Sequence, residues 1–513
     1  MPSSPWPIGH LFAHAARRWP DRPCWVSVEG RSRTFGEVDE RIDRLCDALA
    51  ARGVGRGTRI AVLDTDSFAY AELLGACLKL GATSVPVNYR LAPFEIDNIL
   101  GRAEPEWFFV GERYVETARS VVKTLPGQCG LVSLDGSLDD DVEALVAEGR
   151  AVAPDVVPDE DDVLCIMFTS GTTGLPKGVV QSHRMLKRML FLGQETKPPA
   201  GSVRYTASPI FHVAGWILVA NAVSQGATSL IHPQFDAEVV AGAIASGLLT
   251  GAFLVPTMIQ QVLEVDRGPA AAERLDTLLY GSAPMPPSLL RRALQRWPDV
   301  EFWNMFGAGT ESGLQTLLRP DDHRRALSGE EHLLGSVGQP VLGVDLRILD
   351  DDGVECPPGV VGHVAARTDS MMAGYLDMPE LTRTTLHDGW FFGGDRGWLD
   401  ERGYLYLGGR SRDMIVRGGE NIYVAEVETV LTEVPGVADA AVVGRPDETW
   451  GEVVVAFVEH RDAPPPSVPD LEAMCRSRLA GYKVPVEYHV LAVLPRNPTG
   501  KVRKNQLLEL VGG

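Results

Sequence analysis

The stretch of this sequence with the clearest chemical character is MFTSGTTGLPKGVV, residues 167–180. It continues the apolar run at 163–168 and then offers hydroxyls, backbone N–H groups and a lysine. Glycine lets the backbone close around an anion without a Cβ clash, and successive N–H groups form an anion-binding concavity. The loop is not G-x-x-x-x-G-K-[ST], because Gly178 follows the lysine. Against a plain surface turn, we favour a phosphate-binding loop made of Thr169, Ser170, Gly171, Thr172, Thr173, Gly174 and Lys177.

The elements around this loop alternate between helix and strand. Apolar side chains recur at helical spacing in 36–52 and 69–81, and short apolar runs at 59–63 and 163–168 are typical of buried strands. This alternation indicates an α/β protein with a largely parallel sheet. Residues 135–162 are acidic and contain proline, which we interpret as a surface connection.

From about residue 344 the pattern changes. Apolar and polar residues alternate through 344–367, with Asp-Gly and Pro-Pro-Gly turns, which predicts antiparallel hairpins. Beyond the Gly408–Gly409 pair, helix and strand patterns mix again. Since a single core stops growing at about 250–300 residues, we expect two domains in this chain, a large one at 1–408 and a small mobile one at 409–513.

Composition and net charge indicate which partners and which cell compartment to expect. The chain has 513 residues, of which 45% are hydrophobic and 23% charged, and its formal net charge is −20. An acidic surface repels nucleic acid, and no apolar run approaches the roughly 18 residues of a membrane span. Seven scattered cysteines and an N-terminus without a signal-peptide pattern fit a reducing compartment. We therefore expect a cytoplasmic protein with no nucleic-acid partner and no membrane span.

Further motifs accompany the loop in a fixed order. They are SPIFHVAGW (208–216), YGSAPMP (280–286), GSVGQPVLGV (335–344), GYLDMPELTRTTLHDGWFFGGD (374–395), GRSRDMIVRGGENIYVAEVE (409–428) and PRNPTGKVRK (495–504). With TSGTTGLPKG, this series resembles the adenylate-forming superfamily of acyl-CoA synthetases, luciferases and peptide-synthetase adenylation domains. In texture it is closest to fatty or aryl acyl-CoA ligases, and the resemblance covers essentially the whole chain.

The resemblance implies a fold and a reaction. The fold is α/β, with a large N-terminal domain of stacked mixed sheets with helices plus a β-barrel-like part, and a small mobile α+β C-terminal domain. The reaction is ATP-dependent activation of a carboxylic acid to an acyl-adenylate with release of pyrophosphate, followed by transfer to coenzyme A. ATP, Mg²⁺ and coenzyme A are the implied participants. Such chemistry requires stabilised charge at phosphorus, positioned substrates and exclusion of water.

At matching positions the resemblance also implies residue roles. The loop at 169–177 holds the β- and γ-phosphates, and Lys501 bridges the carboxylate and the α-phosphate. The small domain then rotates about a hinge at Gly409, which brings the coenzyme A-binding residues Arg417, Gly418 and Gly419 to the site. Glu311 holds Mg²⁺, a hard cation suited to oxygen. The adenosine residues are Ser282, Ala283, Phe306, Thr310, Asp395 and Arg410, and the acyl pocket comprises His212, Trp216, Val255, Gly281 and Ala308, of which His212 also steers the carboxylate.

Taken singly, these residues have structural readings too. For Lys501 alone we favour a solvated charge in a basic tail, and Asp395 alone could equally cap a helix or close a turn. The flanking motifs carry the functional assignments. An ordinary core or surface position is the alternative for Phe306, Trp216, His212 and Glu311.

The sequence departs from the family pattern at three places. Relatives usually carry Asp or Lys at the hinge, where this chain has Gly409. Gly393 and Gly394 precede Asp395 in place of Thr-Gly, which removes a hydroxyl near the nucleotide. The usual aromatic-Gly-x-Thr-Glu has an extra residue, since both Ala308 and Gly309 separate Gly307 from Thr310.

Three functions remain open on these grounds. The leading hypothesis is an AMP-forming acyl-CoA synthetase. The second keeps the adenylation step and passes the acyl group to an amine or a carrier-protein thiol, and the third is a nucleotide-binding pseudoenzyme. The apolar candidates Trp216, Val255, Ala283 and Ala308 favour a fatty, alicyclic or aryl monocarboxylate.

Overall fold

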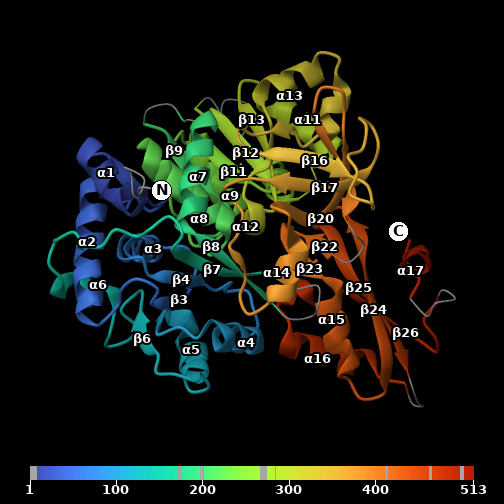
Figure 1. The fold of residues 1–513 in the computed structure, drawn as a ribbon, viewed down its shortest axis with the longest axis horizontal. Coiled ribbons are helices and arrows are strands. Elements are labelled where there is room, and N and C mark those ends of the chain that lie inside the picture. Colours follow the sequence, from blue (N-terminus) through green and yellow to red (C-terminus); the bar gives the residue numbers. More distant parts are fainter. Residues whose placement is uncertain are drawn as a thin grey trace. The chain divides into compact units, whose positions relative to one another are not determined.

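A computed structural model describes residues 8–169, 176–196, 198, 201–265, 274–283, 285–410, 414–460, 465–496 and 502–512, with only the backbone at 409, 410, 425 and 505. Its ribbon is drawn in Figure 1. The chain divides into two compact units. The first comprises Met1–Tyr89, Ala103–Met167 and Val179–Gly409, and the second Arg90–Arg102, Phe168–Gly178 and Arg410–Gly513. The predicted boundary between 408 and 409 stays a prediction.

A mixed nine-stranded sheet, which we call sheet A, is the larger frame of the first unit. Its six central strands pair in parallel, and antiparallel strands flank them at both ends. In spatial order the strands are β15 (Gln339–Pro340), β14 (Thr316–Leu318), β13 (Glu301–Phe306), β12 (Thr277–Gly281), β11 (Gly251–Leu254), β9 (Val203–Thr206), β10 (Thr228–Leu230), β1 (Pro23–Val26) and β2 (Ser32–Thr34).

A second, seven-stranded sheet, sheet B, carries the strand that leads into the predicted phosphate loop. Its strands β3 to β7 pair in parallel, whereas β18 pairs antiparallel with β8. In order they are β18 (Gly374–Tyr375), β8 (Lys177–Ser182), β7 (Val163–Thr169), β4 (Thr83–Pro86), β3 (Arg59–Leu63), β5 (Trp107–Val110) and β6 (Gly130–Ser133). The apolar runs predicted as strands at 59–63 and 163–168 are thus confirmed.

Helices pack against these sheets and against each other. The predicted helix at 36–52 is confirmed as α2 (Phe35–Ala51), which Thr34 and Glu37 cap reciprocally, and the one at 69–81 as α3 (Phe68–Leu80), which ends at Gly81 in a left-handed conformation. The other helices of the first unit are α1 (Leu11–Arg18), α5 (Val115–Val122), α7 (His183–Leu192), α8 (Val213–Gln225), α9 (Ala237–Ala245), α10 (Pro256–Glu264), α11 (Pro287–Arg296), α12 (Gly309–Ser312), α13 (Pro320–Leu327) and α14 (Pro379–Thr385).

One interpretation from the sequence was wrong. The stretch 135–162 is not only a surface connection, because it contains α6 (Val142–Glu148), which lies beside α2 in Figure 1. Asp141 caps the helix, and Val142, Leu145 and Val146 are buried in the main core. These side chains have helical spacing, but the acidic and proline-containing surroundings hid so short a pattern.

The predicted hairpins form a smaller antiparallel sheet, sheet C. It contains β16 (Asp345–Leu349), β17 (Gly362–Arg367), β20 (Trp390–Leu399) and β19 (Leu386–His387), with β21 (Leu405–Arg410) beside β20. Gly338 connects sheet C to sheet A. Its carbonyl accepts from the N–H of Leu405 at 2.8 Å, and a Cβ at Gly338 would lie 2.0 Å from the carbonyl carbon of Leu317 in β14.

The second unit contains its own sheet and a buried cluster of charged side chains. Sheet D comprises β23 (Glu420–Tyr423), β22 (Met414–Arg417), β25 (Gly451–His460), β24 (Val437–Asp447) and β26 (Glu487–Leu491). Lys483 Nζ lies 2.7 Å from carboxylate oxygens of both Glu95 and Glu426, and all three side chains are buried. Because a buried ammonium needs such partners, this triad joins α4 (Pro93–Ala103) to α15 (Val424–Thr432). Further helices of this unit are α16 (Val468–Arg478) and α17 (Lys504–Leu510).

In the described part of the chain, no helix is long and apolar enough to cross a membrane. All seven cysteines are free thiols, as the sequence predicted.

Two glycine substitutions test the junction between sheets A and C. Gly338 and Gly353 both have positive φ, +95° and +78°, but a Cβ at Gly353 meets nothing within 4 Å. Gly353→Ala should therefore destabilise by only about 1 kcal/mol. Gly338→Ala adds a clash with the backbone of β14, and we expect at least about 3 kcal/mol in total. Chemical denaturation compares the two, and equal midpoints would contradict the close contact.

Candidate functional site

The predicted site residues of sheet A follow four neighbouring parallel strands. In spatial order these are β13, β12, β11 and β9. Because parallel strands end at one edge of a sheet, the segments after them lie along that edge, where α/β proteins bind ligands. Phe306 is the last residue of β13 and Gly281 that of β12, and the segments that follow contain residues 307–311 after β13, Ser282 and Ala283 after β12, Val255 after β11 and His212 after β9.

Two glycines allow close packing at this edge. A Cβ at Gly281 would lie 2.2 Å from the carbonyl oxygen of Met305, and one at Gly307 would lie 2.1 Å from that of Gly313. Real Cβ atoms do not approach oxygen so closely, so both positions require glycine. Ser282 follows in a left-handed conformation, with φ of +63°. A non-glycine residue in this conformation is unfavourable by about 1–2 kcal/mol, and such strain clusters at functional sites.

The extra residue between Gly307 and Thr310 forms part of a helical turn. Ala308 precedes α12, and its carbonyl accepts from the N–H groups of Glu311 and Ser312, both at 2.8 Å. Gly309 packs on the start of α8, since a Cβ there would lie 3.2 Å from Cγ1 of Val213. The insertion thus fits in a compact turn, and this turn brings Glu311 and Thr310 next to the helix that begins after His212.

The turn is fixed from its other side by residues 368–372. The hydroxyl of Ser370 donates to the carbonyl of Ser312 at 2.8 Å, and the N–H of Met372 donates to the carbonyl of Glu311 at 2.7 Å. Ser370 is fully buried. The backbone of Glu311 is therefore held at both its N–H and its carbonyl, which fixes where this residue lies at the edge of sheet A.

His212 is the N-cap residue of α8. Its Nδ1 accepts from the N–H of Ala214 at 3.2 Å and lies 3.1 Å from Oγ of Ser208. The preceding turn is anchored by the buried Asp66, whose carboxylate accepts from the N–H of Ile210 at 2.8 Å. Nδ1 thus has partners within the protein and the ring as a whole is partly exposed, and the role of His212 at the acyl pocket stays a prediction.

The two aromatic candidates occupy different surroundings. Phe306 is half-buried and packs against residues of sheet C such as Leu346 and Leu405. Part of the Phe306 ring thus packs in the core, and its exposed part is compatible with contact to a ligand. Trp216 is 3% exposed and belongs to the main core. This burial fits the core alternative, and the role of Trp216 in the acyl pocket stays a prediction.

The nucleotide candidates outside sheet A lie on two strands of sheet C. Asp395 is in β20 and is 7% exposed, and Arg410 is the last residue of β21. The predicted hinge residue, Gly409, is also in β21. The ribose-binding role of Asp395 and the nucleotide contact of Arg410 stay predictions.

Only the ends of the predicted phosphate loop are described. Thr169 ends β7 and its hydroxyl is buried, with no hydrogen-bond partner among the described residues. Lys177 begins β8, is 6% exposed, and lies 5.1 Å from the ring centroid of Tyr423. An orphaned hydroxyl is suited to an added acceptor such as a phosphate oxygen. Outside the described residues lie Ser170, Gly171, Thr172, Thr173, Gly174 and Lys501.

The predicted coenzyme A-binding loop is a tight turn between β22 and β23. Gly418 and Gly419 have φ of +58° and +86°. The N–H of Gly418 donates to the carbonyl of Trp450 at 2.9 Å, and Arg417 lies over the Trp450 ring. Arg417 also donates to the carbonyl of Tyr482 at 2.9 Å, and burial lowers the pKa of its guanidinium.

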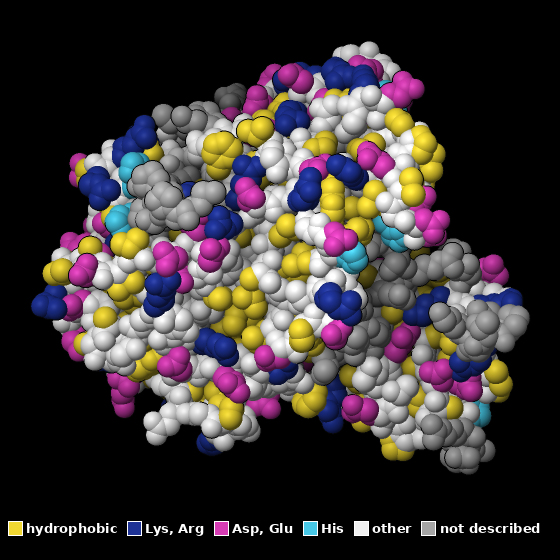
Figure 2. All heavy atoms as spheres, viewed as in Figure 1, with side chains coloured by type: hydrophobic (Ala, Val, Ile, Leu, Met, Phe, Trp, Pro, Cys, Tyr) yellow, Lys and Arg dark blue, Asp and Glu magenta, His cyan; other side chains and the backbone are white. Residues whose placement is uncertain are grey.

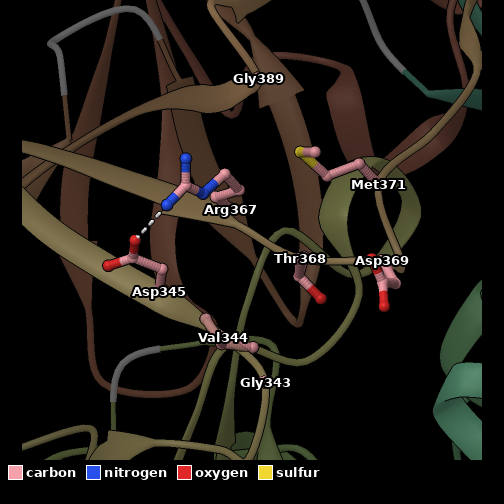
Figure 3. A pocket seen from close by; sticks show the side chains of 8 residues that line it. All are labelled: Gly343, Val344, Asp345, Arg367, Thr368, Asp369, Met371 and Gly389. Atoms are coloured by element: carbon pink, nitrogen blue, oxygen red, sulfur yellow. Dashed lines mark hydrogen bonds and ion pairs between the residues drawn. The ribbon is translucent and has the colours of Figure 1, made fainter.

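An open hollow of about 730 Å³ lies between sheet C and the segment 368–371 (Figure 3). None of the predicted site residues lines it. Arg367 points across it to Asp345, at 2.7 Å, so its charge is already compensated. On the face drawn in Figure 2, side chains of both signs are interspersed among the described residues.

Sequence reasoning missed the buried pair beneath β12. The hydroxyl of Tyr280 lies 2.8 Å from Nε2 of His323, whose Nδ1 lies 2.8 Å from the carbonyl of Arg319. Since a carbonyl only accepts, Nδ1 carries the proton and Nε2 accepts from Tyr280. Ser208 and Asp66 were missed as well. Ser208 and Asp66 meet their partners through loops, and loops have no periodic sequence pattern from which such contacts could be predicted.

Fold and site together define an adenylate-forming enzyme, and comparison with known proteins agrees. A family model described as AMP-binding enzyme matches residues 12–376, and one described as AMP-binding enzyme C-terminal domain matches residues 426–501. The chain therefore belongs to the AMP-binding enzyme family.

The relatives differ in the acceptor that their names state. A fatty acid–[acyl-carrier-protein] ligase, ScoC, from Streptomyces coeruleorubidus is 34% identical over 97% of this chain and 95% of its own length. A feruloyl-CoA synthase from an Amycolatopsis species is 35% identical over 96% and 98%. The solved structure of the amide bond synthetase McbA from Marinactinospora thermotolerans superposes with a TM-score of 0.89, at 27% identity, over 98% and 99%.

The buried His323 makes a prediction about acid stability. Burial lowers the pKa of its imidazole to about 4. In the unfolded chain a histidine binds its proton near pH 6.5. The unfolded state therefore gains protons first as the pH falls, and stability is lost between about pH 6.5 and 4, by up to roughly 3 kcal/mol for this one group. Above pH 6.5 the histidine makes no pH-dependent contribution.

We expect His323→Gln to flatten the fall of the thermal midpoint between pH 6.5 and 4.5. His183, whose pKa burial also lowers to about 4, serves as the comparison. His183 is still present in the variant, so the thermal midpoint should still fall with pH, but less steeply than in wild type. An unchanged slope in His323→Gln would contradict the neutral, buried state of His323.

Proposed function

We propose that this protein is an AMP-forming acyl-CoA ligase, which joins a carboxylic acid to coenzyme A at the expense of ATP. The observation that carries the proposal is the edge of sheet A, where four neighbouring parallel strands end in segments that contain the predicted adenosine and acyl-pocket residues. Membership of the family supports the adenylation step. The acceptor and the acid are our proposals. We also place the enzyme in the cytoplasm, which its free cysteines support.

The residues present fit ATP with Mg²⁺. Magnesium binds through one or two carboxylates plus substrate phosphates and keeps several waters, so it needs no dedicated protein cage. Glu311 supplies such a carboxylate, and no group of three or more ligating side chains occurs among the described residues. When bound, the ion would neutralise phosphate charge. The loop from Thr169 to Lys177 would hold the β- and γ-phosphates, with Phe306 against adenine and Asp395 on the ribose.

The chemistry of the first step assigns a role to Lys501. A carboxylate and an α-phosphate repel each other as they approach, and an ammonium between them lowers that barrier. Once the adenylate exists, the same ammonium obstructs the thiol. We propose that residues 409–513 then rotate about Gly409, whose lack of a side chain permits a large backbone change. Gly418 and Gly419 would pass close to the pantetheine arm.

The acid would enter between α8 and the strand ends. Val255 is 6% exposed and Trp216 lies in the core, and neither offers charge to a second carboxylate or an amino group. His212 is the polar residue at this position. We therefore propose a fatty, alicyclic or aryl monocarboxylic acid as the substrate class.

A second candidate keeps adenylation and changes the acceptor. The names of two relatives state a carrier-protein thiol and amide-bond synthesis, and both proteins align with nearly the whole chain. The retained RGGENIY loop at 417–423 favours coenzyme A.

A panel of acids and acceptors tests the proposal. Purified protein with Mg²⁺ and ATP should release pyrophosphate with at least one monocarboxylic acid, and a thioester should form only when coenzyme A is added. Mass spectrometry of the products distinguishes the candidates. An amide formed with an added amine would support the second one, and ATP binding without any turnover would indicate a pseudoenzyme.

Substitution of Lys501 tests the division of labour between the two steps. Lys501→Ala should lower pyrophosphate release at least about a thousandfold, as for loss of a group that stabilises transition-state charge. Thioester formation from synthetic acyl-adenylate should remain within severalfold of wild type, because that step does not need this ammonium.

Lys504→Ala provides the matched control. Lys504 lies 2.8 Å from Glu428, so the variant loses a lysine from the same tail together with one ion pair. Its adenylation rate should stay near that of wild type. Near-normal pyrophosphate release by Lys501→Ala would overturn the assignment.

A further inference from the structure

The ring of His212 is held at one nitrogen from two sides. Nδ1 lies 3.2 Å from the backbone nitrogen of Ala214 and 3.1 Å from Oγ of Ser208. A backbone N–H can only donate, so Nδ1 must present its lone pair. In a neutral imidazole the single proton then resides on Nε2. A flipped ring would turn a carbon toward both groups and leave the N–H of Ala214 without this acceptor.

Ser208 is itself fixed in position. It is 8% exposed and lies in the turn between β9 and α8. This turn packs directly on the helix, since a Cβ at Gly215 would lie 2.5 Å from the carbonyl oxygen of Ser208 and 2.1 Å from that of Pro209. The N–H of His212 donates to the same Pro209 carbonyl at 2.9 Å. The turn therefore holds the Ser208 hydroxyl close to Nδ1 of His212. Because Nδ1 accepts, the hydroxyl donates.

The two donors also exclude a proton from Nδ1. An N–H at that atom would face the N–H of Ala214 and the positive end of the α8 dipole. The carboxylate of the nearby Asp66 is directed at the N–H of Ile210, at 2.8 Å. His212 is thereby prepared as a donor through Nε2 and not as a proton acceptor at Nδ1.

We propose that Ser208 is a positioning residue, which together with the N-terminus of α8 holds His212 as the neutral Nε2–H tautomer. This rests on the proposed function. The Nε2–H donates to the carboxyl oxygen of the acid that becomes the carbonyl oxygen of the adenylate, and keeps that bond while the acceptor attacks.

No proton joins or leaves His212 in either step. When coenzyme A is the acceptor, the C–S bond forms as the C–O bond to AMP breaks. AMP takes the electron pair, and the thiol proton passes to solvent. A general-base role for His212 toward a thiol or an amine is thereby excluded.

Nitrogen-15 NMR of histidine-labelled protein tests the tautomer. The His212 signals are identified by their loss in His212→Gln. Near neutral pH, wild type should show Nδ1 as the unprotonated and Nε2 as the protonated nitrogen. A protonated Nδ1 in wild type overturns the proposal, and this reading requires neither turnover nor a folded Ser208 variant.

Kinetics test the role of the hydroxyl. Ser208→Ala should mix the two tautomers and lower kcat for pyrophosphate release about tenfold, equivalent to one hydrogen bond, with KM for ATP unchanged. Ser208→Thr, which retains a hydroxyl, should restore both readings. A kcat for Ser208→Ala within twofold of wild type would contradict the proposal.

Ser84→Ala is the control. Ser84 is 4% exposed and donates to the carbonyl of Leu164 at 3.3 Å in sheet B, so the variant also loses one buried hydroxyl bond. It should change neither the His212 signals nor kcat. If wild type forms no adenylate with any acid, the proposed function fails, and the NMR result still decides the tautomer. If wild type turns over but carries its proton on Nδ1, this inference alone fails.

Discussion

The parallel register of β9, β11, β12 and β13 is the constraint on which the site depends. Neighbouring strands lie about 4.8 Å apart, so segments that leave successive strands at one edge are within reach of a single ligand. The spacing is kept at the edge itself only because Gly281 allows β12 to lie against the carbonyl of Met305. A side chain at that position would separate the two strand ends that carry the predicted adenosine contacts.

An acidic protein that handles anions has to rely on short-range interactions. The net charge of −20 repels ATP and carboxylic acids at a distance. At physiological salt the Debye length is only about 8 Å, so groups within the site outweigh the distant surface. In the proposed site, the hydroxyl of Thr169 and the cation of Lys177 would act in that range. The proposed site would thus rely on oriented donors and a few cations at short range.

Sequence patterns predicted the elements well where a strand is completely buried in the core or where apolar and polar residues alternate regularly. The runs at 59–63 and 163–168 became buried strands, and the alternation at 344–367 became the hairpin of β16 and β17. They failed for α6, where three apolar residues in an acidic stretch were too few to show a period. Residue type alone was not enough to assign functions to individual residues. Trp216 and Asp395 are both buried, and burial alone does not distinguish a ligand contact from a core position, so their predicted roles stay predictions.

The sequence by itself determined the chemistry available to this protein. A glycine-rich and hydroxyl-rich loop, its lysine, and motifs in a fixed order are local properties, because they depend on residue types and spacings along the chain. Only the tertiary structure decided how these groups are held. The bond from Ser208 to His212, the anchor of Asp66 on Ile210 and the turn around Gly309 all join irregular segments. Such segments have no repeating pattern, and the packing of the sheets and helices around them sets which atoms meet.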